Sequence, residues 1–453
     1  MSERQQKFDF IDSYKEELII NNFLNLKTKI SFGSFNCLTG SNAVGKTVIF
    51  KLLSFFHILP RVFEPAIEGA TADYIHFGKK DLNKKLQERI DNLLHQEFIK
   101  FFPASKEASD VYKKNFDITY SCLKNGTEEI RWELKCQEEK ITTTSLFKEA
   151  DLKSIINGIE AKIKSSKISA AEEKSINFES YQYLLDVSSC KSVWKFINLK
   201  NDIREKGVFL ESEHESYYDN LNARGKNSNS FISIDSNNRS EVKISSLLEK
   251  LATELKVKSY RVNENNKVII KTFKDKEMLI TQASSGQRDN LSIIVLLNNL
   301  IRNLENEQRD YNFFISLIEE LGNYLYPSGS VELLKAFVTV FLEYQTKKTP
   351  LRIYISTHSS YILNLFNLFL KYAKVRNVLG SKYEKYKEEL SLYLNEEDLY
   401  IYSLEEEAGF IKAVDIKKDI GIYAEKFVDV SNQLIEQMNR ADEIEYLCRK
   451  KGE

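Results

Sequence analysis

The feature that most constrains the fold is an eight-residue loop that fits the pattern G-x-x-x-x-G-K-[ST]: Gly40-Ser41-Asn42-Ala43-Val44-Gly45-Lys46-Thr47. It follows a short apolar strand expected at 35–38 and precedes an apolar helix expected at 47–56. Glycines let the backbone pass close to phosphates, so that N–H groups and the helix N-terminus face the anion. Lys46 is expected to reach the β- and γ-phosphates, and the Thr47 hydroxyl to hold Mg²⁺. The loop therefore predicts a nucleotide-phosphate site between a strand and a helix.

The charge balance excludes bulk electrostatic capture of nucleic acid or membranes. Among 453 residues, 65 Lys and Arg face 66 Asp and Glu, a formal net charge of −1, although a local basic groove stays compatible with this balance. In the basic run 79–85, a solvated helical face is favoured over a DNA-contacting stripe. The five cysteines show no CxxC spacing, which indicates buried thiols in a reducing compartment. The polar N-terminus lacks a signal peptide and no segment is long enough to span a bilayer, so we expect a cytoplasmic protein.

The order of the predicted elements indicates an α/β fold. Antiparallel strands are expected at 17–22 and 27–32, and a β-hairpin at 116–136 turns at Asn125-Gly126. Later, apolar strands at 313–318 and 352–356 alternate with helices at 287–303, 330–346 and 360–373, which is typical of a buried parallel sheet. We divide the chain into an N-terminal lobe (1–140), a mainly helical insertion (141–230) and a C-terminal lobe ending in a helix (231–453).

Three further motifs complete a candidate hydrolytic site. Glu319 and Glu320 end an apolar strand, at the edge of the sheet where ligands bind. Glu319 is expected to contact Mg²⁺ and Glu320 to polarise the attacking water. The segment Ser284–Gln287 precedes a helix and offers donors to a phosphate, and His358, directly after another strand, can hydrogen-bond the γ-phosphate or the water.

In this order the four motifs resemble those of the ABC-type ATPase superfamily, and within it the SMC-like and "OLD" branch of AAA-family ATPases. That branch is similar in having an Asn in the phosphate loop (Asn42) and a Leu-x-Pro segment after the acidic pair, here 325–327. The resemblance implies a P-loop fold of the ABC/SMC-head type, with ATP and Mg²⁺ as cofactors. It covers roughly 15–140 and 230–425.

The resemblance also implies how the residues divide the work. Lys46, Thr47, Glu319, Glu320 and His358 act in cis. A second subunit contributes Ser285 and Gly286, with Gln287 beside them, so that ATP is held in a head-to-tail dimer or higher oligomer. This sequence departs from the pattern in having Leu321 where a Pro commonly follows the acids, and Gln137 is only a weak candidate for the glutamine that touches Mg²⁺.

The same resemblance shapes the expected function. OLD-type enzymes carry a Toprim nuclease that needs an Asp-x-Asp, and the roughly 95 residues after Ser359 contain none; the acidic run 405–407 is expected in a solvated turn. We therefore expect an ATPase that regulates a separate effector, a nuclease, in bacterial anti-phage defence, with DNA or a phage component as a further partner left open. The alternatives are a DNA-repair or chromosome-maintenance ATPase of the SMC-like break-repair or RecF kind, a transporter's nucleotide-binding subunit, and an ATP-binding scaffold that does not hydrolyse.

Overall fold

The computed structural model describes the larger part of the chain: 14–41, 44–57, 82–102, 115–124, 127–137, 140–144, 191–195, 242–262, 268–279, 282–284, 314–318, 321, 325–346, 351–379 and 391–420, with scattered residues of 287–301. No helix within these ranges is long and apolar enough to cross a membrane. The C-terminal helix expected at 427–449 lies outside them.

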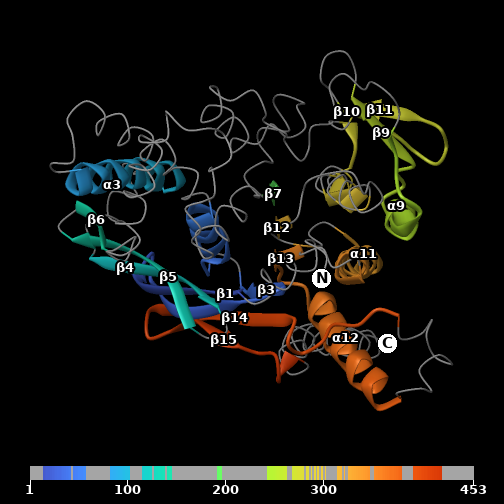
Figure 1. The fold of residues 1–453 in the computed structure, drawn as a ribbon. Helices are drawn as coiled ribbons and strands as arrows, with labels where there is room; N and C mark the ends of the chain where they lie inside the picture. Colours follow the sequence, from blue (N-terminus) through green and yellow to red (C-terminus); the bar gives the residue numbers. More distant parts are fainter. Residues whose placement is uncertain are drawn as a thin grey trace, which may run out of the picture.

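Most described strands join one large mixed sheet, in the order β6-β5-β4-β1-β2-β15-β14-β3-β13-β12-β7 (Figure 1). Its strands are β1 Tyr14–Phe23, β2 Leu26–Phe32, β3 Phe35–Gly40, β4 Phe116–Lys124, β5 Thr127–Gln137, β6 Lys140–Thr144, β7 Lys191–Lys195, β12 Phe314–Ile318, β13 Leu351–Ser356, β14 Leu399–Glu407 and β15 Phe410–Asp415. The predicted α/β fold with N-terminal antiparallel strands is confirmed.

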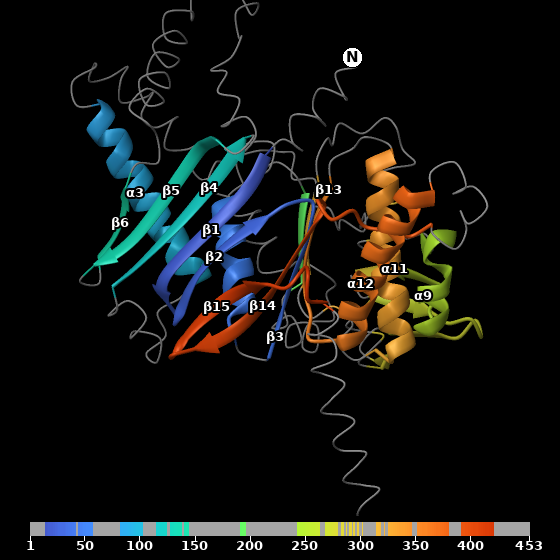
Figure 2. The same ribbon diagram turned by 90° about the horizontal axis from the view of Figure 1, so that it is seen from below.

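One half of the sheet is parallel and is covered by helices. β3 pairs in parallel with β13 and β14, and β12 pairs in parallel with β13 and β7. Every residue of β3 and β13 is buried, as expected for strands enclosed on both faces. Helices α11 (Pro327–Thr346) and α12 (Ser360–Leu379) lie beside this half (Figure 2). Pro327 occupies the first helical position, where a missing N–H costs nothing, so α11 begins a turn earlier than predicted.

The other half is antiparallel and packs through aromatic rings. β1 lies between β2 and β4, and α3 (Leu82–Phe101) lies alongside β4–β6. The Phe23 ring lies 5.7, 5.1 and 4.8 Å from the rings of Phe98, Phe102 and Phe116. The helix at 46–57, called the P-loop helix below, adds Phe55, whose ring lies 5.4 Å from that of Phe98. These contacts join the P-loop helix to the antiparallel half.

A second, smaller sheet has the order β11-β10-β9-β8, with bounds β8 Val242–Lys243, β9 Ser259–Val262, β10 Val268–Lys271 and β11 Glu277–Leu279. Between β8 and β9 lie a 3-10 turn (Ser246–Leu248) and α9 (Glu249–Glu254). Leu251 and Leu255 are buried in the same hydrophobic cluster as Phe337 of α11. The small sheet is therefore attached to the parallel half through α9.

Two expectations need adjustment. Within the predicted insertion, the described residues are strands: the end of β6, and β7, which extends the large sheet beside β12. The rest of the predicted, mainly helical insertion lies outside the described residues. The acidic run 405–407 is not in a turn but ends β14, where the Glu407 carboxylate pairs with Lys412 across the hairpin. The expected solvation holds for Glu406 and Glu407, which are exposed.

Candidate functional site

The loop at 40–47 connects β3 to the P-loop helix, and glycine is required at both of its ends. Gly40 has φ +129° and Gly45 has φ +88°, a region that L side chains rarely adopt. A Cβ on Gly40 would lie 2.6 Å from the Leu404 carbonyl oxygen, and one on Gly45 would lie 3.1 Å from Leu26. Asn42 and Ala43 lie outside the described residues. Both glycines are therefore required by their positive φ and by the close packing of Leu404 and Leu26 against the loop.

Lys46 is the first residue of the P-loop helix, and its side chain turns back onto the loop. Lys46 is 7 % exposed, and its ammonium donates hydrogen bonds to the carbonyl oxygens of Gly40 at 2.9 Å and Ser41 at 2.7 Å. Thr47 follows it and is half-buried. An ammonium held over a glycine-lined loop, next to a hydroxyl, is a donor set that fits nucleotide phosphates and a magnesium ion.

The end of β13 meets this loop. Thr357, fully buried, donates its backbone N–H to the Leu38 carbonyl at 3.0 Å, two residues before the loop begins. Its hydroxyl donates to the Leu321 carbonyl at 3.2 Å, and the Leu321 N–H donates to the Ser356 carbonyl at 2.8 Å. His358, the next residue, is exposed. The ends of β3 and β13 and the residue that follows the acidic pair therefore share one edge.

The acidic pair itself, Glu319 and Glu320, lies outside the described residues, but its flanks do not. Ile318 ends β12, in register with Ile355 of β13, and Leu321 is bound to β13 as above. On its other side Ile318 is in register with Lys195 of β7. The strand next to the acidic pair thus comes from the predicted insertion, which sequence reasoning did not foresee. The apolar residues Val193 and Trp194, followed after one lysine by Phe196 and Ile197, are the sequence signal that could have indicated it.

Ser284 and Gln287 form the start of the 287–301 helix. The Gln287 N–H donates to Ser284 Oγ at 3.3 Å, and the Ser284 N–H donates to Gln287 Oε1 at 3.1 Å, a reciprocal capping box. Gln287 Nε2 also donates to the carbonyl of Leu255, the C-cap of α9, at 2.9 Å. These bonds hold the segment to α9 rather than to the loop at 40–47. Ser285 and Gly286 lie outside the described residues.

Gln137, the weak candidate for a magnesium contact, ends β5 and pairs with Lys140 of β6. β5 belongs to the antiparallel half, not to the parallel strands whose ends meet the loop. In the strand order, β5 is separated from β3, β12 and β13 by other strands, so Gln137 does not lie at the edge where those strands end.

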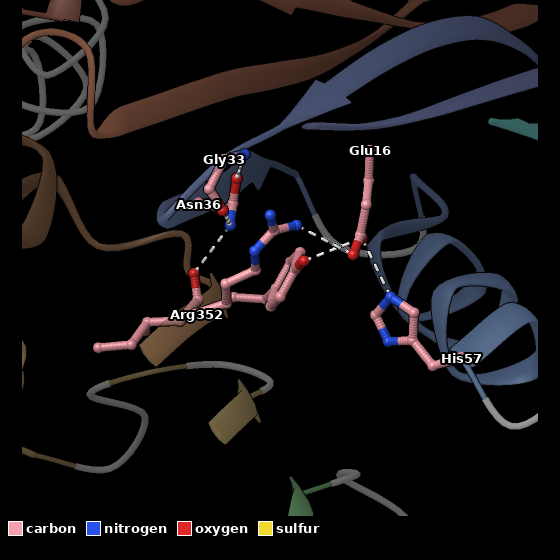
Figure 3. Close-up of polar contacts among 7 residues, drawn as sticks. Glu16, Gly33, Asn36, His57 and Arg352 are labelled. Atoms are coloured by element: carbon pink, nitrogen blue, oxygen red, sulfur yellow. Dashed lines mark hydrogen bonds and ion pairs between the residues drawn. The ribbon is translucent and has the colours of Figure 1, made fainter. Parts of the chain in front are cut away.

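Sequence reasoning missed a buried polar group, which we call the Glu16 cluster: Glu16, His57 and Arg352, labelled in Figure 3, together with Tyr354. The Glu16 carboxylate on β1 receives Arg352 Nη1 at Oε1, and Tyr354 Oη and His57 Nε2 at Oε2, each at 3.0 Å. All four residues are at most 4 % exposed. No motif joins residues so distant in sequence, although a charged Glu16 and Arg352 inside apolar strands are a signal of pairing.

Burial and neighbouring charges shift the pKa values of Glu16 and Tyr354 in this cluster and of Cys37 on β3. Burial alone would raise the pKa of Glu16, but the charges of His57 and Arg352 and the hydrogen bonds from His57 and Tyr354 lower it to about 2. Glu16 is therefore a carboxylate at neutral pH. Burial raises the pKa of the Cys37 thiol on β3, against the opposing charge of Lys46. The expectation of buried thiols is confirmed for Cys37 and Cys136.

Comparison with known families and structures gives one family match. The profile of the family described as "AAA ATPase domain" matches residues 15–363. Among solved structures, the chain is similar to the SMC head domain from Thermotoga maritima, at 11 % identity and TM-score 0.33, covering 88 % of this chain and 98 % of that one. It is also similar to the Smc head domain with an extended coiled coil bound to the C-terminal domain of ScpA, derived from Pyrococcus furiosus, at 10 % identity and TM-score 0.37, covering 91 % and 99 %. No curated protein matches the chain.

Proposed function

The chain belongs to the AAA ATPase domain family, and from this premise we propose that it binds and hydrolyses ATP at the 40–47 loop and dimerises around the nucleotide to regulate a separate effector. The observation that carries the proposal is the position of the Lys46 ammonium. It lies on the Gly40 and Ser41 carbonyls at 2.9 and 2.7 Å, at the edge where β13 delivers Thr357 and His358. A cation, a glycine-lined loop and a histidine at one sheet edge suit the recognition of phosphates.

In this proposal each residue has a defined role. Lys46 exchanges its carbonyl acceptors for phosphate oxygens, and the Thr47 hydroxyl and Glu319 hold Mg²⁺, which when bound neutralises charge on the phosphates. Glu320 orients and polarises the attacking water, and His358 donates a hydrogen bond to the γ-phosphate. All of these groups act by position and charge, which is most of what phosphoryl transfer requires of a protein.

Dimerisation is supported by the segment after the acidic pair. Tyr326 is 84 % exposed directly before α11, and Tyr361 in the first turn of α12 is 51 % exposed. Large aromatic side chains are enriched where proteins meet partners. In the proposal this face meets a second copy, whose Ser285 and Gly286 complete the ATP site.

The effector, a nuclease of an anti-phage system, is proposed from the resemblance given above. In this proposal the chain has the regulatory part and the effector carries the nuclease activity. Degradation of DNA or tRNA by the purified chain alone would contradict that assignment.

Phosphate release tests the site. Lys46→Ala and Glu320→Gln are each expected to lower ATP turnover by about 100-fold or more, because each removes a group that acts on the transition state. Lys51→Ala, on the same helix but away from the loop, is the matched control. Unchanged turnover in Lys46→Ala would show that the site is elsewhere. Light scattering with ATP tests the dimer: Glu320→Gln is expected to double in mass, and Tyr326→Ala in that background to remain a monomer.

A further inference from the structure

Three structural elements meet at the single carboxylate of Glu16. The residue is on β1, His57 is the last described residue of the P-loop helix, and Arg352 lies on β13. Tyr354, two residues further along β13, faces the same side as Arg352. Figure 3 shows His57 and Arg352 approaching the carboxylate from opposite sides. Glu16 therefore links two elements that have no direct hydrogen bond to each other among these contacts.

The linked elements are those that carry the site. The P-loop helix begins with Lys46, and β13 continues into Thr357 and His358. At the loop, β13 is bound to β3, the strand that leads into the loop, by the hydrogen bond from the Thr357 N–H to the Leu38 carbonyl. The Glu16 cluster binds β13 to the P-loop helix itself, at the far end of a helix about 17 Å long. The loop end of the helix is therefore connected to β13 through β3, and its far end through Glu16, and the two connections together restrict how the helix can turn relative to the strand.

Burial strengthens the contacts that Glu16 makes with the helix and with β13. Glu16 and Tyr354 are 0 % exposed, His57 is 2 % and Arg352 is 4 % exposed. Charge-assisted hydrogen bonds in such surroundings are stronger than those on the surface and do not exchange with water. An apolar set of side chains could fill the same volume at no loss of stability, so the ionic arrangement is not explained by packing alone.

We infer that Glu16 is a positioning residue that holds the P-loop helix and β13 in one fixed relation, so that phosphate binding at Lys46 is transmitted to Thr357 and His358. The inference rests on the proposed ATPase function. It assigns Glu16 no contact with nucleotide. Its effect is on the alignment of the groups that do make contact, where small displacements have large consequences for rate.

Two matched substitutions separate this role from simple stabilisation. His57→Phe and Tyr354→Phe each keep an aromatic ring and each remove one donor to the same oxygen, Oε2, at 3.0 Å. His57→Phe removes the hydrogen bond between Glu16 and the P-loop helix, whereas Tyr354→Phe leaves that bond in place and Glu16 still binds β13 through Arg352. We expect His57→Phe to lower kcat by about 10- to 100-fold while the Kd for ATP stays within about threefold. Tyr354→Phe is expected to keep kcat within about twofold of the wild type.

Amide hydrogen exchange supplies a readout that does not depend on turnover. In the wild type, MgATP is expected to slow exchange both in the P-loop helix and in the peptide 351–359. In His57→Phe the helix should still respond and the strand peptide should not. Equal kcat values for the two variants, or a retained response at 351–359 in His57→Phe, would overturn the inference. If the wild type itself neither binds nor hydrolyses ATP, the proposed function fails and this inference with it. If the wild type hydrolyses ATP and His57→Phe does so equally well, the inference alone fails.

Discussion

At its N-terminal end the P-loop helix places Lys46 on two backbone carbonyls, five and six residues earlier in the sequence. At its C-terminal end it places His57 on a carboxylate 41 residues earlier, which in turn binds Arg352, 336 residues later. The first contact uses local backbone, and in the proposed function Lys46 exchanges it for phosphate oxygens. The second uses side chains from distant elements and is sealed from water. We call the N-terminal end of the helix, with Lys46, the exchangeable end, and the C-terminal end, with His57, the permanent end.

The largest effect is expected at the permanent end. Glu16→Ala removes the carboxylate that faces the buried Arg352 guanidinium, and loss of one partner of a buried ion pair costs about 3–5 kcal/mol. The free energy of unfolding, measured with urea, checks this value.

Arg261→Ala is the matched control, because Arg261 and Glu277 form a 2.8 Å ion pair on the small sheet whose side chains are 33 % and 46 % exposed. Its cost is expected to be at most about 1 kcal/mol. Equal costs for the two variants would mean that the buried Glu16–Arg352 pair contributes no more to stability than an exposed ion pair.

Acid should weaken the permanent end selectively. The pKa of Glu16 in the folded protein is about 2, against the ordinary value of 4.5. A lowered pKa means that its contribution is complete above about pH 4.5 and is lost as the pH falls towards about 2, a total of about 3 kcal/mol.

Comparison of wild type with Glu16→Gln measures this contribution, since the glutamine cannot titrate. The difference between their unfolding free energies should shrink steadily between about pH 4.5 and 2. A difference that does not vary with pH would mean that the carboxylate charge is not what holds the cluster.

A smaller effect on stability is expected at the exchangeable end. Gly40→Ala forces φ +129° on an alanine and brings its Cβ to 2.6 Å from the Leu404 carbonyl, which should cost about 1–3 kcal/mol and abolish measurable ATP binding.

Gly409→Ala is the control for backbone strain, because Gly409 has φ +78° but no atom within 4 Å of its Cβ. We expect it to cost about 1 kcal/mol and to leave the Kd for ATP unchanged. If Gly40→Ala bound ATP normally, the loop would not be the phosphate site.

Local patterns were the predictable part of this chain. The strand before the loop, the helix after it and β13 were all placed within one or two residues, because each is rich in apolar side chains and is bounded by a turn residue. α3 was not predicted beyond a helical face at 79–85, since its buried residues, such as Leu94 and Phe98, are embedded in a polar sequence. β7 has only five residues, and such a strand depends on its partner for stability.

The sequence by itself determined the local chemistry of the proposed site: Lys46, Thr47 and His358 follow from motifs whose geometry lies within a few residues of backbone. Only the tertiary structure decided which strand lies beside the acidic pair, and that Glu16, His57 and Arg352 meet in one buried cluster. The physical reason is that strand pairing and buried ion pairs depend on contacts between residues far apart in the chain, which no local pattern of side chains records.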